Sequence, residues 1–234
     1  MNKFVHRQDC IALLICIIGF VIYIFVQQHR FDTLAESRIY DFNARHSVVS
    51  QADLLSFVNM KLEFFNFTNL YAEGQPHLQD PFVPHISYNL LQFGLDTDMI
   101  GYLSIPAIDM DLPIFVGTSD ANLGRGVAHL LHSSFPVGGV HTHAVIAGNR
   151  RLNYARLFQD IEYLEVGDEI YVTNFYQRLV YVVVNTQIIP PGQLDALRIQ
   201  DYRDLLTLVT QHNNGNIFNR NGYRYVVTAE RMDR

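Results

Sequence analysis

Four histidines near the middle of the chain are the first candidates for chemistry: His129, His132, His141 and His143. If His141 and His143 lay on one strand, both rings would point to the same face and could share a metal ion. A zinc site takes three or four ligands, and neither an H-E-x-x-H helix nor a nearby carboxylate completes this set. The sequence therefore predicts ordinary turn or edge-strand histidines, and we expect neither a metal site nor a cofactor.

Two serines, Ser133 and Ser134, follow His132 and are candidates for a hydroxyl nucleophile beside a base. Adjacent side chains rarely converge, however, and no G-x-S-x-G elbow surrounds the pair. The stretch SSFPVGG is more typical of a loop. Gly124 and Gly126 match a nucleotide-binding fingerprint only in part, because the strand before them and the helix after them are missing.

The elements that would position these residues are mainly β-strands. After residue 100 the chain alternates turn residues with short runs rich in Val, Ile, Tyr and Thr, which is typical of strands. The predicted strands are IGYLSIP, DLPIFVG, THAVIAG, DEIYVTN, RLVYVVVNTQII, LLTLVT and YRYVVTAE. Short helices are expected only in residues 154–164 and 201–205, so the pattern favours an all-β barrel or sandwich over repeated βαβ units.

The N-terminus contains a candidate membrane segment. Residues 11–26 form an uncharged apolar run, slightly shorter than the roughly 20 residues that cross a bilayer, with Lys3 and Arg7 before it and Arg30 after it. A cleaved signal peptide is the alternative, but no small-x-small cleavage site follows the run. We interpret residues 1–30 as a cytoplasmic tip and an uncleaved, single-pass signal-anchor, with the rest of the chain outside the cell.

Residues 31–72 are predicted to form a helical arm beyond the membrane segment. Apolar residues such as Leu34, Ile39, Phe42 and Leu62 recur there at helical spacing, without an internal proline or glycine. This pattern predicts an amphipathic helix.

Residues 73–99 are predicted to be a lid loop and connector, and residues 100–234 the β domain. Three prolines and a glycine within EGQPHLQDPFVP disfavour any regular element there. The triplet Asp80, Pro81 and Phe82 is by itself a turn, although a mobile segment could also place its carboxylate and ring in a groove.

Composition excludes several chemistries for the β domain. Cys10 and Cys16 are the only cysteines, and both lie in or beside the apolar run. A disulfide, a zinc–thiolate site and a cysteine nucleophile are therefore excluded from the rest of the chain. The net charge is −6, with acidic residues in excess after residue 30, so nucleic acid is not an expected partner.

Four stretches of the β domain resemble sortases, specifically the class C, pilin-polymerising kind. They are IGYLSIPAIDMDLPIFVGTSDANLGRGVAHL, FPVGGVHTHAVIAGNRRLNYARLFQDIEYLEVGDEIYV, LLTLVT and RYVVTAER. The resemblance implies a mostly β fold with a closed sortase-type β-barrel and short helices, preceded by the transmembrane helix and the arm. It also implies a place on the Gram-positive cell surface and a lid formed by Asp80, Pro81 and Phe82.

The family mechanism uses three groups. A cysteine attacks a carbonyl of an LPXTG-like sorting signal, a histidine moves protons, and an arginine stabilises the oxyanion, after which an amine resolves the thioester. By the motifs AGNRR, LVTQ and RYVVTAER, the histidine position is Asn149, the cysteine position is Gln211, and the arginine is Arg224. Arg220 is the alternative arginine, although the spacing to the closing Glu-Arg pair favours Arg224.

Two of the three catalytic groups are therefore missing. A carboxamide such as Gln211 is not a useful nucleophile, and Asn149 cannot shuttle a proton near neutral pH. Thr210 and His212 flank position 211, but strand alternation places both on the opposite face from it. We therefore expect the thioester route to be absent.

The sequence thus predicts a pseudoenzyme that keeps the sortase groove and binds a pilin sorting-signal peptide, a partner sortase or both. The alternative is an active peptidase or transpeptidase with a non-cysteine nucleophile, and a decaying gene copy is a third reading. In the first reading we expect Asp80 to face Gln211 and to pair with Arg224, which predicts a closed lid.

Overall fold

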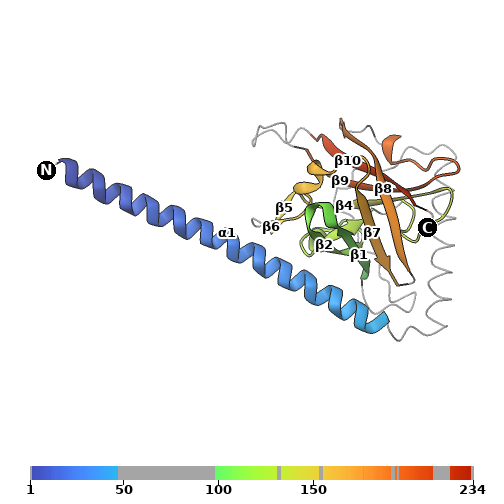
Figure 1. Ribbon diagram of the computed structural model, residues 1–234, viewed down its shortest axis with the longest axis horizontal. Helices are drawn as coiled ribbons and strands as arrows, with labels where there is room; N and C mark the ends of the chain where they lie inside the picture. Colours follow the sequence, from blue (N-terminus) through green and yellow to red (C-terminus); the bar gives the residue numbers. More distant parts are fainter. Residues whose placement is uncertain are drawn as a thin grey trace.

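The computed structural model describes residues 2–46, 98–130, 133–152, 155–175, 177–190, 193, 195–212 and 222–232. Eight strands close into a barrel in the order β1, β2, β3, β4, β9, β10, β8, β7 (Figure 1). The barrel strands are β1 (Met99–Ile105), β2 (Met110–Val116), β3 (Val127–His129), β4 (Thr142–Ala147), β7 (Glu169–Asn174), β8 (Arg178–Ile189), β9 (Asp204–Gln211) and β10 (Arg224–Arg231). The β2–β3 and β4–β9 pairs are parallel, and the other pairs of neighbouring strands in the barrel are antiparallel.

Helices and one small hairpin connect or extend the barrel. They are α1 (Asn2–His46), α3 (Asp120–Leu123), the 3₁₀ helices η2 (Pro106–Ile108), η3 (Asp160–Tyr163) and η4 (Asp195–Leu197), and the hairpin of β5 (Arg151–Leu152) and β6 (Ala155–Arg156). The expected mostly β barrel with short helices and a long N-terminal apolar helix is therefore confirmed.

The seven predicted strands are all strands of the barrel, because runs of β-branched and aromatic residues favour the extended backbone. β3 was not predicted, since three residues are too few to show an alternating pattern. It nevertheless pairs with both β2 and β4, and so it is needed to close the barrel.

One of the two predicted short helices is confirmed in part, and the other is wrong. The described part of residues 154–164 contains strand β6 followed by the short 3₁₀ helix η3. In residues 201–205, Tyr202 has a φ of 61°, which ends any right-handed helix, and β9 begins at Asp204 because this stretch pairs with β4.

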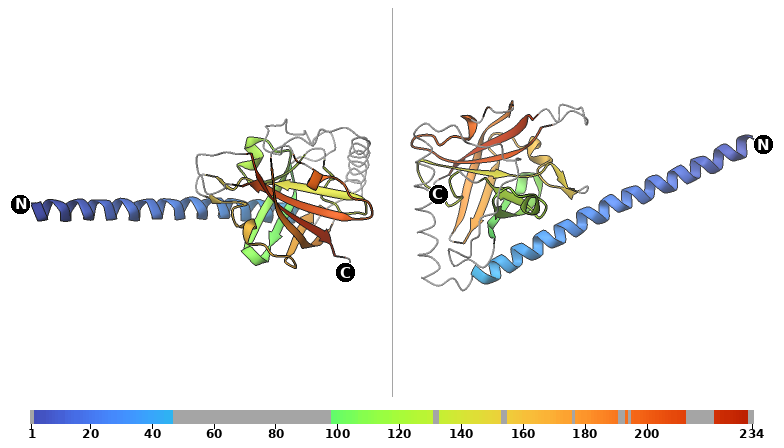
Figure 2. Two further views of the ribbon diagram at one scale, coloured as in Figure 1. Left: turned by 90° about the horizontal axis from the view of Figure 1, so that it is seen from above. Right: turned by 180° about the vertical axis from the view of Figure 1, so that it is seen from behind.

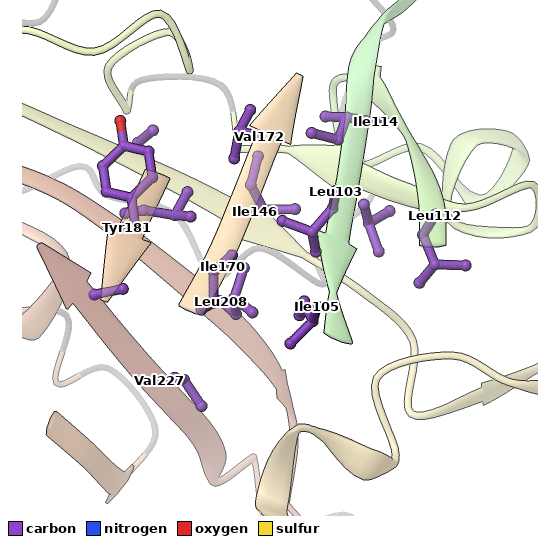
Figure 3. Packing of buried hydrophobic residues seen from close by; sticks show 14 of the residues in the cluster. Leu103, Ile105, Leu112, Ile114, Ile146, Ile170, Val172, Tyr181, Leu208 and Val227 are labelled. Atoms are coloured by element: carbon purple, nitrogen blue, oxygen red, sulfur yellow. The ribbon is translucent and has the colours of Figure 1, made fainter. Parts of the chain in front are cut away.

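Buried side chains on opposite sides of the barrel wall form two apolar clusters. The first fills the interior, where labelled residues such as Leu103, Ile146 and Val172 point toward one another from different strands (Figure 3). The second lies on the outer face of β4, β9 and β10 and includes Leu123 of α3 and Leu197 of η4. These short helices cover that outer face, so the wall is buried on both sides there.

Helix α1 is continuous from the N-terminal apolar run to the barrel and projects from it as a straight rod (Figure 2). Its first part is long and apolar enough to cross a membrane. The expected boundary at residue 30 falls inside this single helix, and the described arm extends to His46. Residues 47–97, which include the predicted lid with Asp80, Pro81 and Phe82, lie outside the described residues.

The arm packs on the barrel through one face of α1. Ala35 and Phe42 are buried at helical spacing, whereas Tyr40 on another face is exposed. The centroid of the Phe42 ring lies 5.0 Å from the centroid of the Phe175 ring and 6.1 Å from that of the Tyr102 ring. The barrel is therefore attached directly to the helix that carries the apolar N-terminal run.

Candidate functional site

The strand register brings Asn149, Gln211 and Arg224 together in one row. Gln211 on β9 lies directly across from Arg224 on β10. Ala147 at the end of β4 pairs with Val209 on β9, and Asn149 and Gln211 each lie two residues further along. Neighbouring strands are about 4.8 Å apart, and a step of two residues returns to the same face. The row therefore crosses the end of three adjacent strands.

Hydrogen bonds extend the β4–β9 pairing beyond the end of β4. The Gly148 amide donates to the Val209 carbonyl at 3.1 Å, and the Thr210 hydroxyl donates to the Gly148 carbonyl at 2.8 Å. A side chain at Gly148 would place its Cβ 2.6 Å from the Phe158 ring, so only glycine fits before Asn149. Thr210 is fully buried on the side away from Gln211, as the alternation predicts.

The row forms the polar edge of an otherwise apolar surface. Gln211 is exposed, and Asn149 and Arg224 are half-buried. Ala147, Val209 and Val226 lie on the same three strands, each two residues from the row and nearer the middle of its strand. All three are fully buried in the outer cluster. The Asn149 amide donates to the Leu123 carbonyl of α3 at 3.3 Å, which connects the row to the helix covering that cluster.

Comparison with known proteins identifies the fold and the family. A family model described as the sortase domain matches residues 103–232, which is more than half of the chain. This chain belongs to the sortase family. The class C resemblance is likewise confirmed by its structural neighbours.

Two solved streptococcal sortases are similar over most of their length. Sortase C1 of GBS pilus island 1 superposes with a TM-score of 0.71 at 30% identity, covering 86% of this chain and 93% of that one. Sortase C1 of Streptococcus pneumoniae gives a TM-score of 0.69 at 28% identity, covering 85% and 99%.

Two relatives found by sequence are named sortase D and sortase A. Sortase D of Bacillus subtilis is 28% identical over 132 residues, and sortase A of Bacillus anthracis is 29% identical over 133 residues. The matches span 56% of this chain in both cases, but only 63% and 59% of those proteins. The chain therefore matches less than two thirds of the length of either relative.

A carboxylate that the sequence analysis did not single out contacts the residues next to the row in this sortase-family domain. The Glu162 carboxylate of η3 accepts hydrogen bonds from both terminal guanidinium nitrogens of Arg150. The bond from Nη2 is 3.1 Å long. His212 Nδ1 lies 3.3 Å from the same carboxylate. Arg150 and His212 directly follow Asn149 and Gln211 in the sequence, so Glu162 links two of the three strands that carry the row.

The electrostatics of Glu162 favour this linkage. Burial alone would raise the pKa of Glu162, but the hydrogen bonds from Arg150 and His212 and their nearby charges outweigh it and hold the pKa below its usual value. A bidentate arginine–carboxylate pair is also geometrically specific. No periodic pattern connects positions 150, 162 and 212, which is why sequence analysis missed them.

Glu162→Gln should loosen the row while the barrel remains folded. We expect amide hydrogen exchange in the segments carrying Asn149 and Gln211 to accelerate about tenfold, since charge-assisted hydrogen bonds contribute about 1.5–3 kcal/mol. Exchange mass spectrometry measures this. The matched control is Glu230→Gln, which breaks the bidentate pair of Glu230 with Arg203, at 3.0 and 2.8 Å, near the other end of β9 and β10. Equal acceleration near Gln211 in both variants would contradict a specific role for Glu162.

The serine candidates are buried and serve the fold. Ser133 and Ser134 are each 3% exposed. The Ser133 hydroxyl donates to the Leu130 carbonyl at 2.8 Å and lies 3.1 Å from Nε2 of His129. His132, the base considered beside them, lies outside the described residues. A hydroxyl with this burial has no access to a peptide substrate.

The described histidines occupy different environments, and the expectation of turn or edge positions is wrong for two of them. His129 on β3 and His143 on β4 are fully buried, and both strands are internal to a closed barrel that has no edge. His141 does lie in a turn, with a φ of 62°, and its ring is 4.9 Å from that of Tyr202. His141 therefore does not share a strand face with His143.

The buried histidine on β4 binds the connection that covers the outer cluster. His143 Nδ1 lies 2.7 Å from the Arg198 carbonyl, just beyond η4, and Nε2 lies 2.6 Å from the Thr207 hydroxyl. Because a carbonyl only accepts, Nδ1 carries the proton and Nε2 accepts one. Burial lowers the pKa of His143 from 6.5 to about 4, with the nearby charge of Arg203 adding to the effect and the Arg198 carbonyl opposing it.

Arg224 is the one of the two arginine candidates that the structure describes. Arg224 pairs with Gln211 across β9 and β10, which is the placement an arginine beside the cysteine position requires. Its Nη1 donates to the Tyr223 carbonyl at 3.2 Å. Arg220 lies outside the described residues.

Proposed function

We propose that this chain is a membrane-anchored, sortase-like pseudoenzyme that binds LPXTG-like pilin sorting signals without cleaving them. Its N-terminus would lie in the cytoplasm and its barrel outside a Gram-positive cell, where it would assist pilus assembly alone or with a partner sortase. The lid of Asp80, Pro81 and Phe82 remains part of this proposal.

One observation supports the proposal: beside Arg224 the row contains two carboxamides, Asn149 and Gln211, at the positions that we assign from the sortase motifs to a histidine and a cysteine. Gln211 and Asn149 are hydrogen-bonding groups without nucleophilic or proton-transfer chemistry near neutral pH. The sequence has no cysteine after Cys16, so a displaced thiol cannot replace the missing one. The row can hold a peptide by hydrogen bonds, and that is the function it retains.

The competing proposal of a non-cysteine nucleophile finds little support in the described residues. Thr210 is fully buried and donates to a carbonyl, and Ser133 is similarly enclosed. His212 lies two residues after Thr210, but its Nδ1 is directed to Glu162. None of these groups forms an exposed nucleophile with a base beside it.

Peptide binding tests the proposal directly. Full-length protein in lipid nanodiscs should bind a fluorescent LPXTG-like peptide, and mass spectrometry should recover the peptide uncleaved. Arg224→Ala should weaken binding about tenfold, because a charge-assisted hydrogen bond is lost. Arg178→Ala is the matched control, since Arg178 is an exposed arginine that lies over Tyr171 at the far end of β8. Absence of binding, or cleavage by the natural chain, would overturn the proposal.

A further inference from the structure

The row lies at the same end of the barrel as the 3₁₀ helices η2 and η3. Glu162 of η3 binds Arg150 and His212, which directly follow two members of the row. Helix η3 in turn contacts η2, which follows the last residue of β1. We call this part of the barrel the row end. The opposite end holds the start of β9 at Asp204 and, two residues before it, Tyr202.

Helix α1 meets the barrel first at the row end. Phe31 packs against the interior cluster, and Asp32 lies close enough to Asp109, just after η2, for their charges to repel. Further along α1, Phe42 packs with Met99, which is the first residue of β1 and lies at the other end of that strand. The N-terminal part of α1 therefore leaves the barrel from the row end. In Figure 1, β5 and β6 lie on the side that faces the N-terminus of α1, whereas the C-terminus lies on the opposite side.

The apolar run of α1 ends only a few residues before this contact. Residues 11–26 measure about 24 Å as a helix, which is less than the hydrocarbon layer of about 30 Å, so the bilayer surface falls at or just beyond Val26. Phe31 lies five residues, or about 8 Å, beyond Val26 in the same continuous helix. A headgroup layer is about 5–8 Å thick. The contact between α1 and the barrel therefore begins at the outer edge of that layer.

Two exposed apolar side chains at the row end suit a layer of lipid headgroups. Tyr163 of η3 is 72% exposed, and Val166, in the turn before β7, is 70% exposed. This turn lies at the row end because β7 contacts η2 and its first residues lie beside the end of β1. Tyrosine is enriched at membrane interfaces, since it combines an apolar ring with a polar hydroxyl. Glu165 between them is exposed and acidic, so the surface fits zwitterionic headgroups better than anionic ones.

We infer that α1 holds the row end of the barrel against the outer surface of the membrane, with Tyr163 and Val166 in contact with zwitterionic lipid headgroups. This inference rests on the proposed function, because it takes α1 as the membrane anchor. It adds a second contact with the membrane, made by the barrel itself. A ligand then reaches the row along the membrane surface.

Two exposed tyrosines at opposite ends of the barrel provide a matched test. Tyr163→Cys and Tyr202→Cys, each combined with Cys10→Ser and Cys16→Ser, accept one fluorescent label apiece. Tyr202 is 83% exposed, and the 8 residues of β9 separate it from the row by about 26 Å. In nanodiscs of phosphatidylcholine that carries a nitroxide on its headgroup, the Tyr163→Cys label should be quenched severalfold more strongly than the Tyr202→Cys label. Val166→Cys should behave like Tyr163→Cys.

A longer α1 tests whether the helix sets this distance. An insertion of about seven helix-forming residues after Arg30 moves the barrel about 10 Å along the helix axis and nearly preserves its rotation. It should reduce quenching of the Tyr163→Cys label to the level of the Tyr202→Cys label. Melting temperatures measured in parallel show whether each variant is folded. Undiminished quenching in the folded insertion variant would overturn the role assigned to α1.

The outcomes distinguish this inference from the proposed function. Equal quenching of the two labels, in nanodiscs that retain the protein, would overturn the orientation inferred here and leave the proposed function standing. If the full-length chain does not remain in the nanodiscs, the membrane anchor of the proposed function is overturned, and this inference with it. Quenching does not depend on peptide, so a failure of peptide binding leaves the orientation intact.

Discussion

A double variant, Asn149→His with Gln211→Cys, should cleave an LPXTG-like peptide that the natural chain leaves intact. The register would place the new thiol directly across from Arg224 and the new imidazole on the neighbouring strand. A positioned base alone contributes about 10²–10⁴-fold, so we expect at least a hundredfold rise in cleavage over the natural chain. A quenched fluorescent peptide and full-length protein in nanodiscs measure it.

The single variants are the controls for this result. Gln211→Cys alone supplies a thiol without a base, and Asn149→His alone supplies a base without a nucleophile, so both should remain far below the double variant. Each substitution lies at a partly or fully exposed position, so little loss of stability is expected. A silent double variant that still binds peptide would mean that the row lacks the geometry that sortase chemistry requires. Cleavage by the natural chain would instead reveal a different nucleophile.

The fold was largely predictable because local pattern and barrel topology agree. Strand β9, for example, reads as a run of Leu, Val and Thr, and each of its neighbours buries an apolar face against it. Where the prediction failed, a long-range constraint outweighed the local pattern. Asp204 and Leu205 lie within the helix predicted for residues 201–205 but belong to β9, because they pair with Thr142 and His143 on β4.

The candidate site was predictable only through the family motifs. Asn149 and Gln211 are ordinary polar residues, and neither composition nor spacing distinguishes them. Their placement beside Arg224 depends on one parallel and one antiparallel strand pairing, and no sequence pattern specifies that register by itself.

The groups that support the site were missed for a different reason. Glu162 meets Arg150 and His212 only after η3 folds back over the barrel, and sequence separations of 12 and 50 residues carry no signal of contact. The sequence analysis predicts a turn or edge-strand position for His143. Its burial follows from the closed barrel, in which β4 has a partner on each side.

Acidification should destabilise the protein through this buried histidine. The pKa of His143 is lowered to about 4 in the folded state, while an unfolded histidine keeps a pKa near 6.5. Between these values the unfolded state binds more protons than the folded state, so stability rises with pH and is lost as the pH falls through this window. From pH 7 to pH 5 the loss due to His143 is about 2 kcal/mol.

His143→Gln should remove that loss. Glutamine can still donate to the Arg198 carbonyl and accept from Thr207, but it does not titrate. Urea unfolding at pH 7 and pH 5 should therefore give a smaller drop in the free energy of unfolding for the variant, by about 2 kcal/mol. His141→Gln, at the partly exposed turn, is the matched control and should behave like the natural chain.

The comparison between variants is necessary because other groups also make the stability depend on pH. Burial raises the pKa of Asp204, against the hydrogen bonds it accepts, so Asp204 contributes a stability change of the opposite sign as the pH falls. That contribution is common to the natural chain and to His143→Gln, and it cancels in their difference. Protonation takes place at Nε2, which accepts from the Thr207 hydroxyl, while Nδ1 goes on donating to the Arg198 carbonyl, so its first effect should fall on the contact between β4 and Thr207 of β9. An identical pH dependence in the natural chain and His143→Gln would show that the buried imidazole is not the group responsible.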